Sequence, residues 1–173
     1  MKVISAVYKI LLWNTNQNIK RSAGSIGERF INNSRQSCVT NKTFIGNDVS
    51  FNGMRVIGGG DVWIGDCFHC AEGCYIISDN HDYDFGCTIP YDGHRSIPKK
   101  VVIENNVWLG IGVIILPGSH IEEGCIVQAG SVVMGRIPAG AVVGGHPAKL
   151  IKYRDMAHYE ECKKNGKLLR IRI

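Results

Sequence analysis

An aliphatic side chain recurs at every sixth position over much of the chain, and this period limits the fold more than any other feature. A period of six fits neither an α-helix nor a flat strand, but it is typical of a solenoid in which each short unit points one aliphatic side chain inward. Three such units would close one triangular coil, and coils would stack at the strand spacing of about 4.8 Å. The longest run is Ile103, Leu109, Ile115, Ile121, Val127 and Val133; an earlier one is Ile45, Phe51, Ile57 and, after one extra residue, Ile64, Cys70 and Ile76.

Small or aliphatic residues follow the members of the longer run four places later, and glycine and Asn or Asp lie where corners are needed. The four-place positions are Val107, Val113, Ser119, Cys125, Ser131 and Ile137. Glycine accounts for 21 of 173 residues, about 12% against an average near 7%. Corners such as Gly46–Asp48 and Gly58–Gly60 need residues that tolerate tight turns. The segment Asp79–Lys100 has no period, which predicts a loop inserted into the solenoid.

The chain resembles the hexapeptide-repeat acyltransferases, which carry aliphatic-Gly pairs such as Ile45–Gly46, Ile64–Gly65 and Leu109–Gly110. Val107–Gly118 reads VWLGIGVIILPG, and Val127–Val133, Ile137–Gly140 and Gly144–Lys149 follow it as in that family. The resemblance covers about Cys38 to Arg154. It implies an all-β solenoid, a left-handed parallel β-helix, which spacing alone does not give because parallel crossovers are normally right-handed. It also implies a homotrimer with each active site between two solenoids.

The expected organisation is one domain with short appendages. Residues 1–37 are predicted to be a segment packing on the solenoid, residues 38–153 the β-helix with its loop at 79–100, and residues 154–173 a C-terminal helix and tail. Val3 to Trp13 is expected to form a short helix that packs Val3, Val7, Ile10 and Leu11 on the body. The C-terminal helix is predicted from Arg154 to Asn165, ended by Gly166. Leu168–Ile173 alternates and could add an edge strand or pack on a neighbouring subunit.

Composition and charge exclude several classes. The chain has no run of 18 apolar residues, which predicts no transmembrane helix, and no signal-peptide pattern. Seven cysteines without an export signal indicate reduced thiols and a cytoplasmic protein. The formal charge of +5 comes from the residues after Ala148, where basic side chains outnumber acidic ones. That tail shows no nucleic-acid-binding motif, which argues against nucleic-acid binding and leaves a phosphate-bearing ligand, an anionic surface or a solvated tail.

His81 is the candidate catalytic residue, in the stretch Ser78–Asp82 where the period ends. An imidazole beside a loop is suited to general base catalysis near neutral pH, although the residues alone also fit a surface histidine hydrogen-bonded to a neighbour. The resemblance matches His81 to the family's catalytic histidine. Its orienting acceptor could be Asp82, Asp84, Asp92 or a backbone carbonyl. Asp79, Asn80 and Asp92 are the candidate substrate-binding residues.

The donor implied by the resemblance is acetyl-coenzyme A, as a co-substrate. Small residues at corners would let its pantetheine arm approach the backbone, and Trp108 lies near the same groove in the family. Lys149 and Lys152 match two basic positions that would bind the phosphates. Many relatives carry Thr-Lys where this chain has Met134–Gly135, so Arg136 could substitute. The small residues concerned are Gly110, Gly112, Ala129 and Gly130.

No metal is expected. Cys67, Cys70 and Cys74 with His69 between them have a spacing that invites a zinc hypothesis, but Cys70 and Cys74 fall on inward-pointing positions. The γ-type carbonic anhydrases, another branch of the family, use three histidines. His69, His81, His94 and His120 do not show that branch's close histidine pair.

The resemblance, together with the intact His81, therefore implies an acetyl-coenzyme A-dependent O-acetyltransferase that acts on a sugar hydroxyl, in surface polysaccharide or oligosaccharide modification. Two alternatives stay open: an N-acetyltransferase on an amino sugar or other amine, and a non-catalytic solenoid used for assembly. An acyl group other than acetyl also stays open. The acceptor is not named, because specificity would lie in Asp79–Lys100 and the N-terminal segment, which match nothing firmly.

Overall fold

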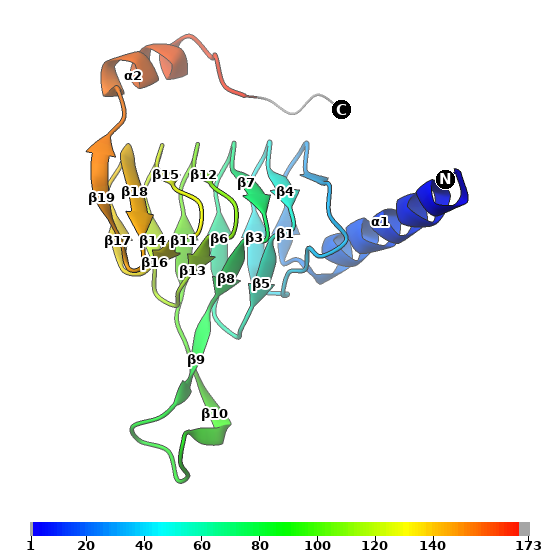
Figure 1. Ribbon diagram of the computed structural model, residues 1–173, viewed down its shortest axis with the longest axis vertical. Coiled ribbons are helices and arrows are strands. Elements are labelled where there is room, and N and C mark those ends of the chain that lie inside the picture. Colours follow the sequence, from blue (N-terminus) through cyan, green and yellow to red (C-terminus); the bar gives the residue numbers. More distant parts are fainter. Residues whose placement is uncertain (1, 170–173) are drawn as a thin grey trace.

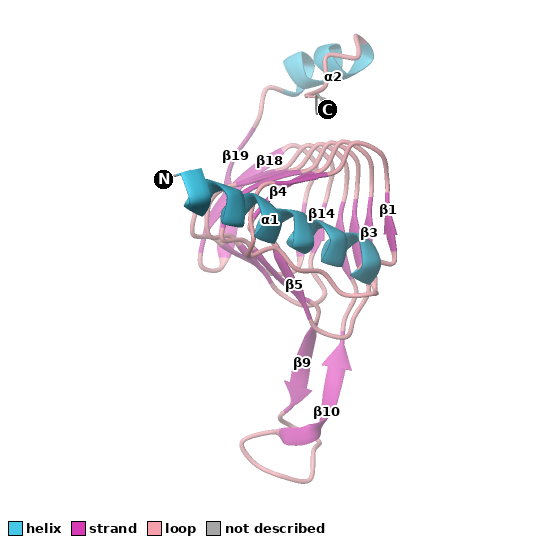
Figure 2. Ribbon diagram, turned by 90° about the vertical axis from the view of Figure 1, so that its right-hand side faces the viewer, coloured by secondary structure: helices cyan, strands magenta, loops and turns pink. Residues whose placement is uncertain are grey.

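Three sheets, parallel except for the last strand of one, wrap around one narrow core and give the chain a triangular cross-section (Figures 1 and 2). The computed structural model describes residues 2–169. Face A contains β1 (Ser25–Ile26), β3 (Thr43–Ile45), β6 (Val62–Ile64), β11 (Val101–Ile103), β14 (His120–Ile121) and β17 (Arg136–Ile137). Face B contains β2 (Ile31–Asn32), β4 (Ser50–Asn52), β7 (His69–Glu72), β12 (Trp108–Leu109), β15 (Ile126–Val127), β18 (Ala141–Gly145) and β19 (Ala148–Tyr153). Face C contains β5 (Arg55–Ile57), β8 (Tyr75–Ile77), β13 (Ile114–Ile115) and β16 (Val132–Val133).

The period-six residues form the core, as the sequence predicts. In register, Ile103 lies between Ile64 and Ile121 on face A, and Leu109 lies between Cys70 and Val127 on face B. Stacking equivalent residues from successive coils removes their apolar side chains from water, which is the main force that holds a solenoid together. The inward positions four places later are buried as well, Cys125 and Ser131 included.

Ile57 is an exception, and its predicted inward position is wrong. Its side chain is 40% exposed, whereas Val56 is buried and pairs with Ile76. The register of β4 on β7 shifts between Ser50 and Asn52. The inward position on face C therefore comes five residues after Phe51 instead of six, and the repeat alone could not reveal this shift.

The aperiodic segment is a β-hairpin. β9 (Asp79–Asp82) and β10 (Asp92–Pro98) pair antiparallel, with His81 opposite Ser96 and Asn80 opposite Ile97. The hairpin leaves the solenoid after β8 on face C and returns to β11 on face A, so it projects from the corner between these two faces (Figure 2).

The N-terminal segment differs from the expectation in length and in contacts. α1 spans Lys2–Ser22, and its buried residue is Ile19. Val7 and Ile10, expected on the packed face, are 49% and 60% exposed, and the side chain of Val3 lies outside the description. The helix therefore approaches the body near its C-terminal end (Figure 1). The solenoid begins at β1, which pairs with β3, and so starts ahead of residue 38.

The predicted C-terminal helix is confirmed with a slightly later start, as α2 (Met156–Lys164). Asp155 caps it by accepting a hydrogen bond from the backbone N–H of His158, and Gly166 follows with a positive φ. Tyr159 is buried and anchors the helix to the corner between faces A and B, where its hydroxyl donates to Glu123 at 2.9 Å. Leu168 and Leu169 lie in no strand, and the rest of the predicted edge strand lies outside the described residues.

In the described part of the chain, no helix is long and apolar enough to cross a bilayer.

Candidate active site

The small residues predicted to face the donor meet at one corner, between faces B and C. Gly110 and Gly112 lie at this corner in one coil, and Ala129 and Gly130 lie at the same corner in the next coil. The Gly130 N–H donates a hydrogen bond to the Ile111 carbonyl at 2.8 Å, which joins the two coils. A Cβ on Gly110 would lie 2.6 Å from the backbone nitrogen of Ala129, so only glycine fits there. Gly112 and Gly130 have φ of +66° and +68°, with open space where a Cβ would be. We call these four residues the B–C ledge.

Trp108 lies beside this ledge. It points outward from face B, is 55% exposed, and pairs in register with His69 on one side and Ile126 on the other. An exposed indole next to an open backbone edge offers a flat apolar surface and free approach to the main chain. The structure thus brings together Trp108 and the four small residues predicted from the sequence.

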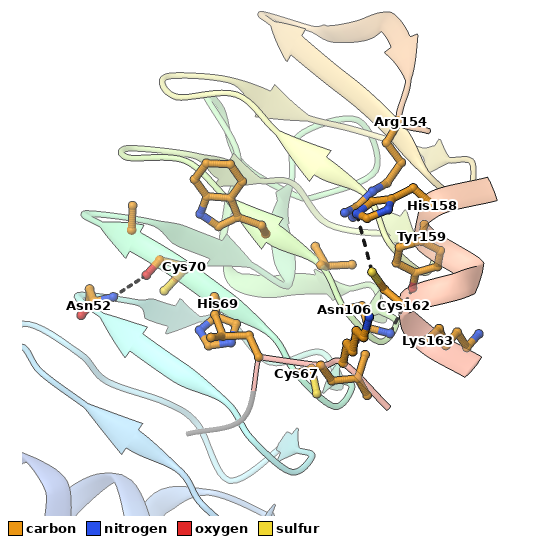
Figure 3. Close-up of a pocket in the computed structure, with 16 residues that line it drawn as sticks. Asn52, Cys67, His69, Cys70, Asn106, Arg154, His158, Tyr159, Cys162 and Lys163 are labelled. Atoms are coloured by element: carbon orange, nitrogen blue, oxygen red, sulfur yellow. Dashed lines mark hydrogen bonds between the residues drawn. The ribbon is translucent and has the colours of Figure 1, made fainter. Parts of the chain in front are cut away.

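A cavity of about 630 Å³ lies between face B and the C-terminal helix (Figure 3). Trp108 is one of its lining residues. Its basic lining comes from the chain after the solenoid: Arg154, Lys163 and Lys167, together with His158. None of its lining residues is acidic, although Lys163 pairs with Glu123 at 2.8 Å. The sequence did not predict that these cations line a site. It showed only that basic residues are in excess after Ala148.

His69 also lines this cavity, from the solenoid side (Figure 3). Its Nε2 atom is buried and has no hydrogen-bond partner among the described residues. Burial lowers the pKa of His69 below its ordinary value, with a smaller opposing contribution from a hydrogen bond to the Leu169 backbone. The ring is therefore favoured in its neutral form.

Lys149 and Lys152 lie elsewhere than the cavity. Both are exposed on β19, opposite Gly144 and Val142 of β18, and neither lines the cavity beside Trp108. Arg136, the expected substitute for a basic position, lies on face A and forms an ion pair with Glu122. Hydrogen bonding by Arg136 lowers the pKa of Glu122, as expected for a carboxylate held by a guanidinium.

His81 lies on β9 of the hairpin, which projects between faces C and A (Figure 2), whereas the B–C ledge lies at another corner. The side chain is exposed and its ring stacks on Tyr91, with centroids 4.0 Å apart and planes 19° apart. Side chains alternate along a strand, so Asp79 and His81 lie on one side of β9 and Asn80 and Asp82 on the other. In agreement, Asn80 and Asp82 line a small cavity of about 80 Å³ that does not include His81.

The carboxylates near His81 have other partners. Asp79 accepts a hydrogen bond from the Gly59 N–H at 2.9 Å. Asp82 is buried, accepts from the Phe85 N–H at 2.9 Å and pairs with Arg95 at 3.3 Å. Asp92 accepts from the N–H groups of His94 and Cys87 at 2.9 and 3.3 Å. These backbone bonds, that from His94 above all, lower the pKa of Asp92.

Cys70 and Cys74, the centre of the zinc hypothesis, are buried in the core. Within residues 2–169 no group of three or more His, Cys, Asp or Glu side chains has an arrangement that could hold a metal ion.

Comparison with known proteins identifies the repeat. Residues 100–135 match the family described as "Bacterial transferase hexapeptide (six repeats)". A protein of Mycobacterium tuberculosis named "Probable acetyltransferase Rv3034c" is 35% identical over 97 residues, 56% of this chain and 32% of its own length. WbbJ of Escherichia coli, whose name assigns it to lipopolysaccharide biosynthesis as an O-acetyl transferase, is 48% identical over 64 residues, 37% of this chain and 33% of its own length. The matches thus span about a third of these relatives.

The fold is that of the hexapeptide-repeat acetyltransferases. The structure of one from Vibrio cholerae, VCA0836, solved with acetyl-coenzyme A, superposes with a TM-score of 0.71 over 88% of this chain and 87% of that one, at 23% identity. The solenoid is therefore a left-handed parallel β-helix. The resemblance read from Val107–Gly118 and the stretches after it is confirmed for the repeat and for the fold.

Proposed function

Because residues 100–135 are hexapeptide repeats of the bacterial transferase type, we propose that this protein is an acetyl-coenzyme A-dependent O-acetyltransferase acting on a sugar hydroxyl. The observation that carries the proposal is the B–C ledge beside Trp108. It combines open space at Gly112 and Gly130 with an exposed indole, and so offers a long thin donor a straight path along the backbone.

The donor's two ends need different partners. The pantetheine arm is apolar and amide-bearing, and the ledge lets it lie against main-chain groups beside Trp108. The phosphate-rich end needs cations. Lys149 and Lys152, both exposed on β19, are proposed to supply them. The cations that line the cavity beside Trp108 could bind the phosphates instead. A kinetic comparison of variants in the two groups of cations distinguishes these possibilities.

His81 is proposed to act as the general base. It removes the proton from the acceptor hydroxyl while that oxygen attacks the thioester carbonyl carbon, forming a new C–O bond. The C–S bond then breaks, and the imidazolium returns the proton to the departing thiolate, so the base is regenerated. The exposure of His81 on the hairpin fits this role, because the ring must reach both the acceptor and the donor thioester. Asn80, Asp79 and Asp92 remain the proposed acceptor contacts.

The separation of His81 from the B–C ledge supports a site shared by two chains. The hairpin leaves the solenoid between faces C and A (Figure 2), whereas the ledge lies between faces B and C, so a hairpin reaching a neighbour's ledge would complete the site. Exposed apolar side chains such as Phe85 and Ile89 on the hairpin are suited to contact with another chain. We therefore propose a homotrimer. Sedimentation at micromolar concentration is expected to show it, and a fully active monomer would contradict the shared site.

The decisive experiment is an acceptor panel with a free-thiol assay. Acetyl-coenzyme A is incubated with the protein and with glucose, galactose, maltose or N-acetylglucosamine as hydroxyl acceptors, and with glucosamine as an amine acceptor. Thiol release with a hydroxyl sugar, and an acetyl ester in the product, is the expected result. Release with glucosamine alone would replace the proposal by N-acetylation. No release with any acceptor, and no binding of acetyl-coenzyme A by calorimetry, would favour an assembly role.

A further inference from the structure

The ring of His81 faces the ring of Tyr91 in a near-parallel stack. The centroids are 4.0 Å apart and the planes make an angle of 19°. Tyr91 is 42% exposed and is not part of the buried core, so burial does not account for its position. A stack through the faces leaves the edge of the imidazole, where its two nitrogens lie, open to a substrate.

This stack is the ring contact that the structure gives His81. A general base needs a third group to hold its ring in one orientation, and a carboxylate of the loop or a backbone carbonyl was expected to do so. The nearby carboxylates Asp82 and Asp92 bind backbone N–H groups of the hairpin instead. Across the residues that the structure describes, neither ring nitrogen of His81 has a hydrogen-bond or ion-pair partner, which leaves ring stacking to do the orienting.

The position of Tyr91 is fixed by the loop that carries it. The Thr88 hydroxyl donates to the Tyr91 carbonyl at 2.9 Å. Asp92, the next residue, accepts hydrogen bonds from backbone N–H groups on both sides of it. Asp92 also begins β10, opposite Asp82. These hydrogen bonds fix the loop where it enters β10, and so they hold the Tyr91 ring over His81 in the absence of substrate.

We propose that Tyr91 is the positioning residue for His81 and that it acts through the face of its ring, not through its hydroxyl. The inference rests on the proposed role of His81 as general base. The stack limits rotation of the imidazole about its Cβ–Cγ bond, so that one nitrogen is kept toward the acceptor. The electron-rich face of Tyr91 also stabilises the positive charge that the imidazole gains when it takes the acceptor's proton.

Three substitutions at position 91 test this mechanism by kinetics. Tyr91→Leu removes the ring, Tyr91→Phe removes only the hydroxyl, and Tyr91→Trp restores an aromatic face. With acetyl-coenzyme A and the best hydroxyl acceptor of the panel, Tyr91→Leu should lower kcat by about 3- to 30-fold, with the KM for acetyl-coenzyme A unchanged. Tyr91→Phe should stay within about twofold of wild type, and Tyr91→Trp should recover most of the loss.

A spectroscopic readout separates positioning from general support of the hairpin. The His81 ring-proton resonance, assigned by its loss in His81→Ala, should be displaced upfield by the tyrosine ring in the wild type and in Tyr91→Phe. In Tyr91→Leu it should move to the position of a free imidazole. Tyr83→Leu is the matched control, since Tyr83 is an exposed tyrosine of the same hairpin with no ring contact to His81. It should leave both kcat and the resonance unchanged.

The results distinguish this inference from the proposed function. Equal kcat for Tyr91→Leu and wild type overturns the inference, whether or not the resonance moves. A loss in Tyr91→Phe as large as that in Tyr91→Leu also overturns it, because the hydroxyl would then be the active group. If His81→Ala keeps wild-type activity, the assignment of the base itself fails, and the effect of Tyr91 on the His81 resonance is then only structural.

Discussion

The B–C ledge and the hairpin carry the two halves of the proposed reaction, and they are built in opposite ways. The ledge is formed by stacked coils whose backbones touch so closely that Gly110 has no room for a Cβ. The hairpin lies outside the solenoid and is held by its own strand pairing, by Asp92 and by the Asp82–Arg95 pair. In the proposed reaction, the rigid repeat would hold the donor, while a separate segment outside the coils would carry the base.

The largest effect is expected in the hairpin. His81→Ala should lower kcat by roughly 10²–10⁴, the usual contribution of a general base, and should leave the melting temperature unchanged because the side chain is exposed. His81→Asn, similar in shape but unable to take the proton, should be nearly as poor. The control is His94→Ala, an exposed histidine of the same hairpin. If His81→Ala retained more than about a tenth of the turnover, the base would have to be sought elsewhere.

In the solenoid, two isoleucines that both fall on the six-residue period, Ile57 and Ile115, differ in burial. Ile115 is fully buried and Ile57 is 40% exposed. Ile115→Ala should lower the free energy of unfolding by about 2–5 kcal/mol, as for other large-to-small changes in cores, whereas Ile57→Ala should cost well under that. Urea denaturation measures both losses of unfolding free energy, provided that the m-value of each variant equals that of the wild type. Equal losses would mean that the repeat, and not the observed register, describes the core.

A glycine pair tests whether the ledge binds the donor. Gly112 and Gly118 both have positive φ, and in neither case would an added Cβ clash with a neighbour. Alanine at either position should therefore lower the free energy of unfolding by a similar amount, about 1–2 kcal/mol. Only Gly112→Ala places a methyl group on the ledge, so only this variant should raise the KM for acetyl-coenzyme A. An equal KM in both variants argues against donor binding there.

The smallest effect concerns the phosphates. Lys149→Ala combined with Lys152→Ala should raise the KM for acetyl-coenzyme A about three- to tenfold, since exposed charges are screened by solvent, and should leave kcat nearly unchanged. The matched variant is Lys163→Ala with Lys167→Ala, which removes two cations from the cavity beside Trp108. If only this second pair raised KM, the phosphates would bind behind Trp108 and not along β19.

The solenoid could be predicted from sequence because its information is periodic. Ile103 and Leu109 point inward for the same reason, and each coil repeats the evidence of the one before. The position of Ile57 was predicted wrongly because a local shift in register does not change the six-residue spacing of the aliphatic residues. The prediction of His81 came from the family resemblance and its position at the end of the repeat.

The arrangement around His81 was not predictable, because it depends on non-periodic contacts. Tyr91 reaches His81 through a loop whose return is set by single hydrogen bonds from Thr88 and to Asp92. Nothing in the spacing of these residues indicates which side chain will face which. The sequence likewise shows Arg154 and Lys163 as part of the basic excess after Ala148. That they line one cavity with Trp108 depends on where Tyr159 anchors α2.

The reversal of β19 on β18 has a consequence for how the protein behaves at high concentration. A parallel solenoid ends in strands with unpaired main-chain groups, and such an end invites another molecule to continue the stack into a fibre. On face B the chain folds back antiparallel and fills that end itself. The new outer strand runs against the direction of the coils and carries Lys149 and Lys152. Lysines on an edge strand disfavour the addition of another molecule to that edge, so the reversed strand should make end-to-end growth of face B unfavourable.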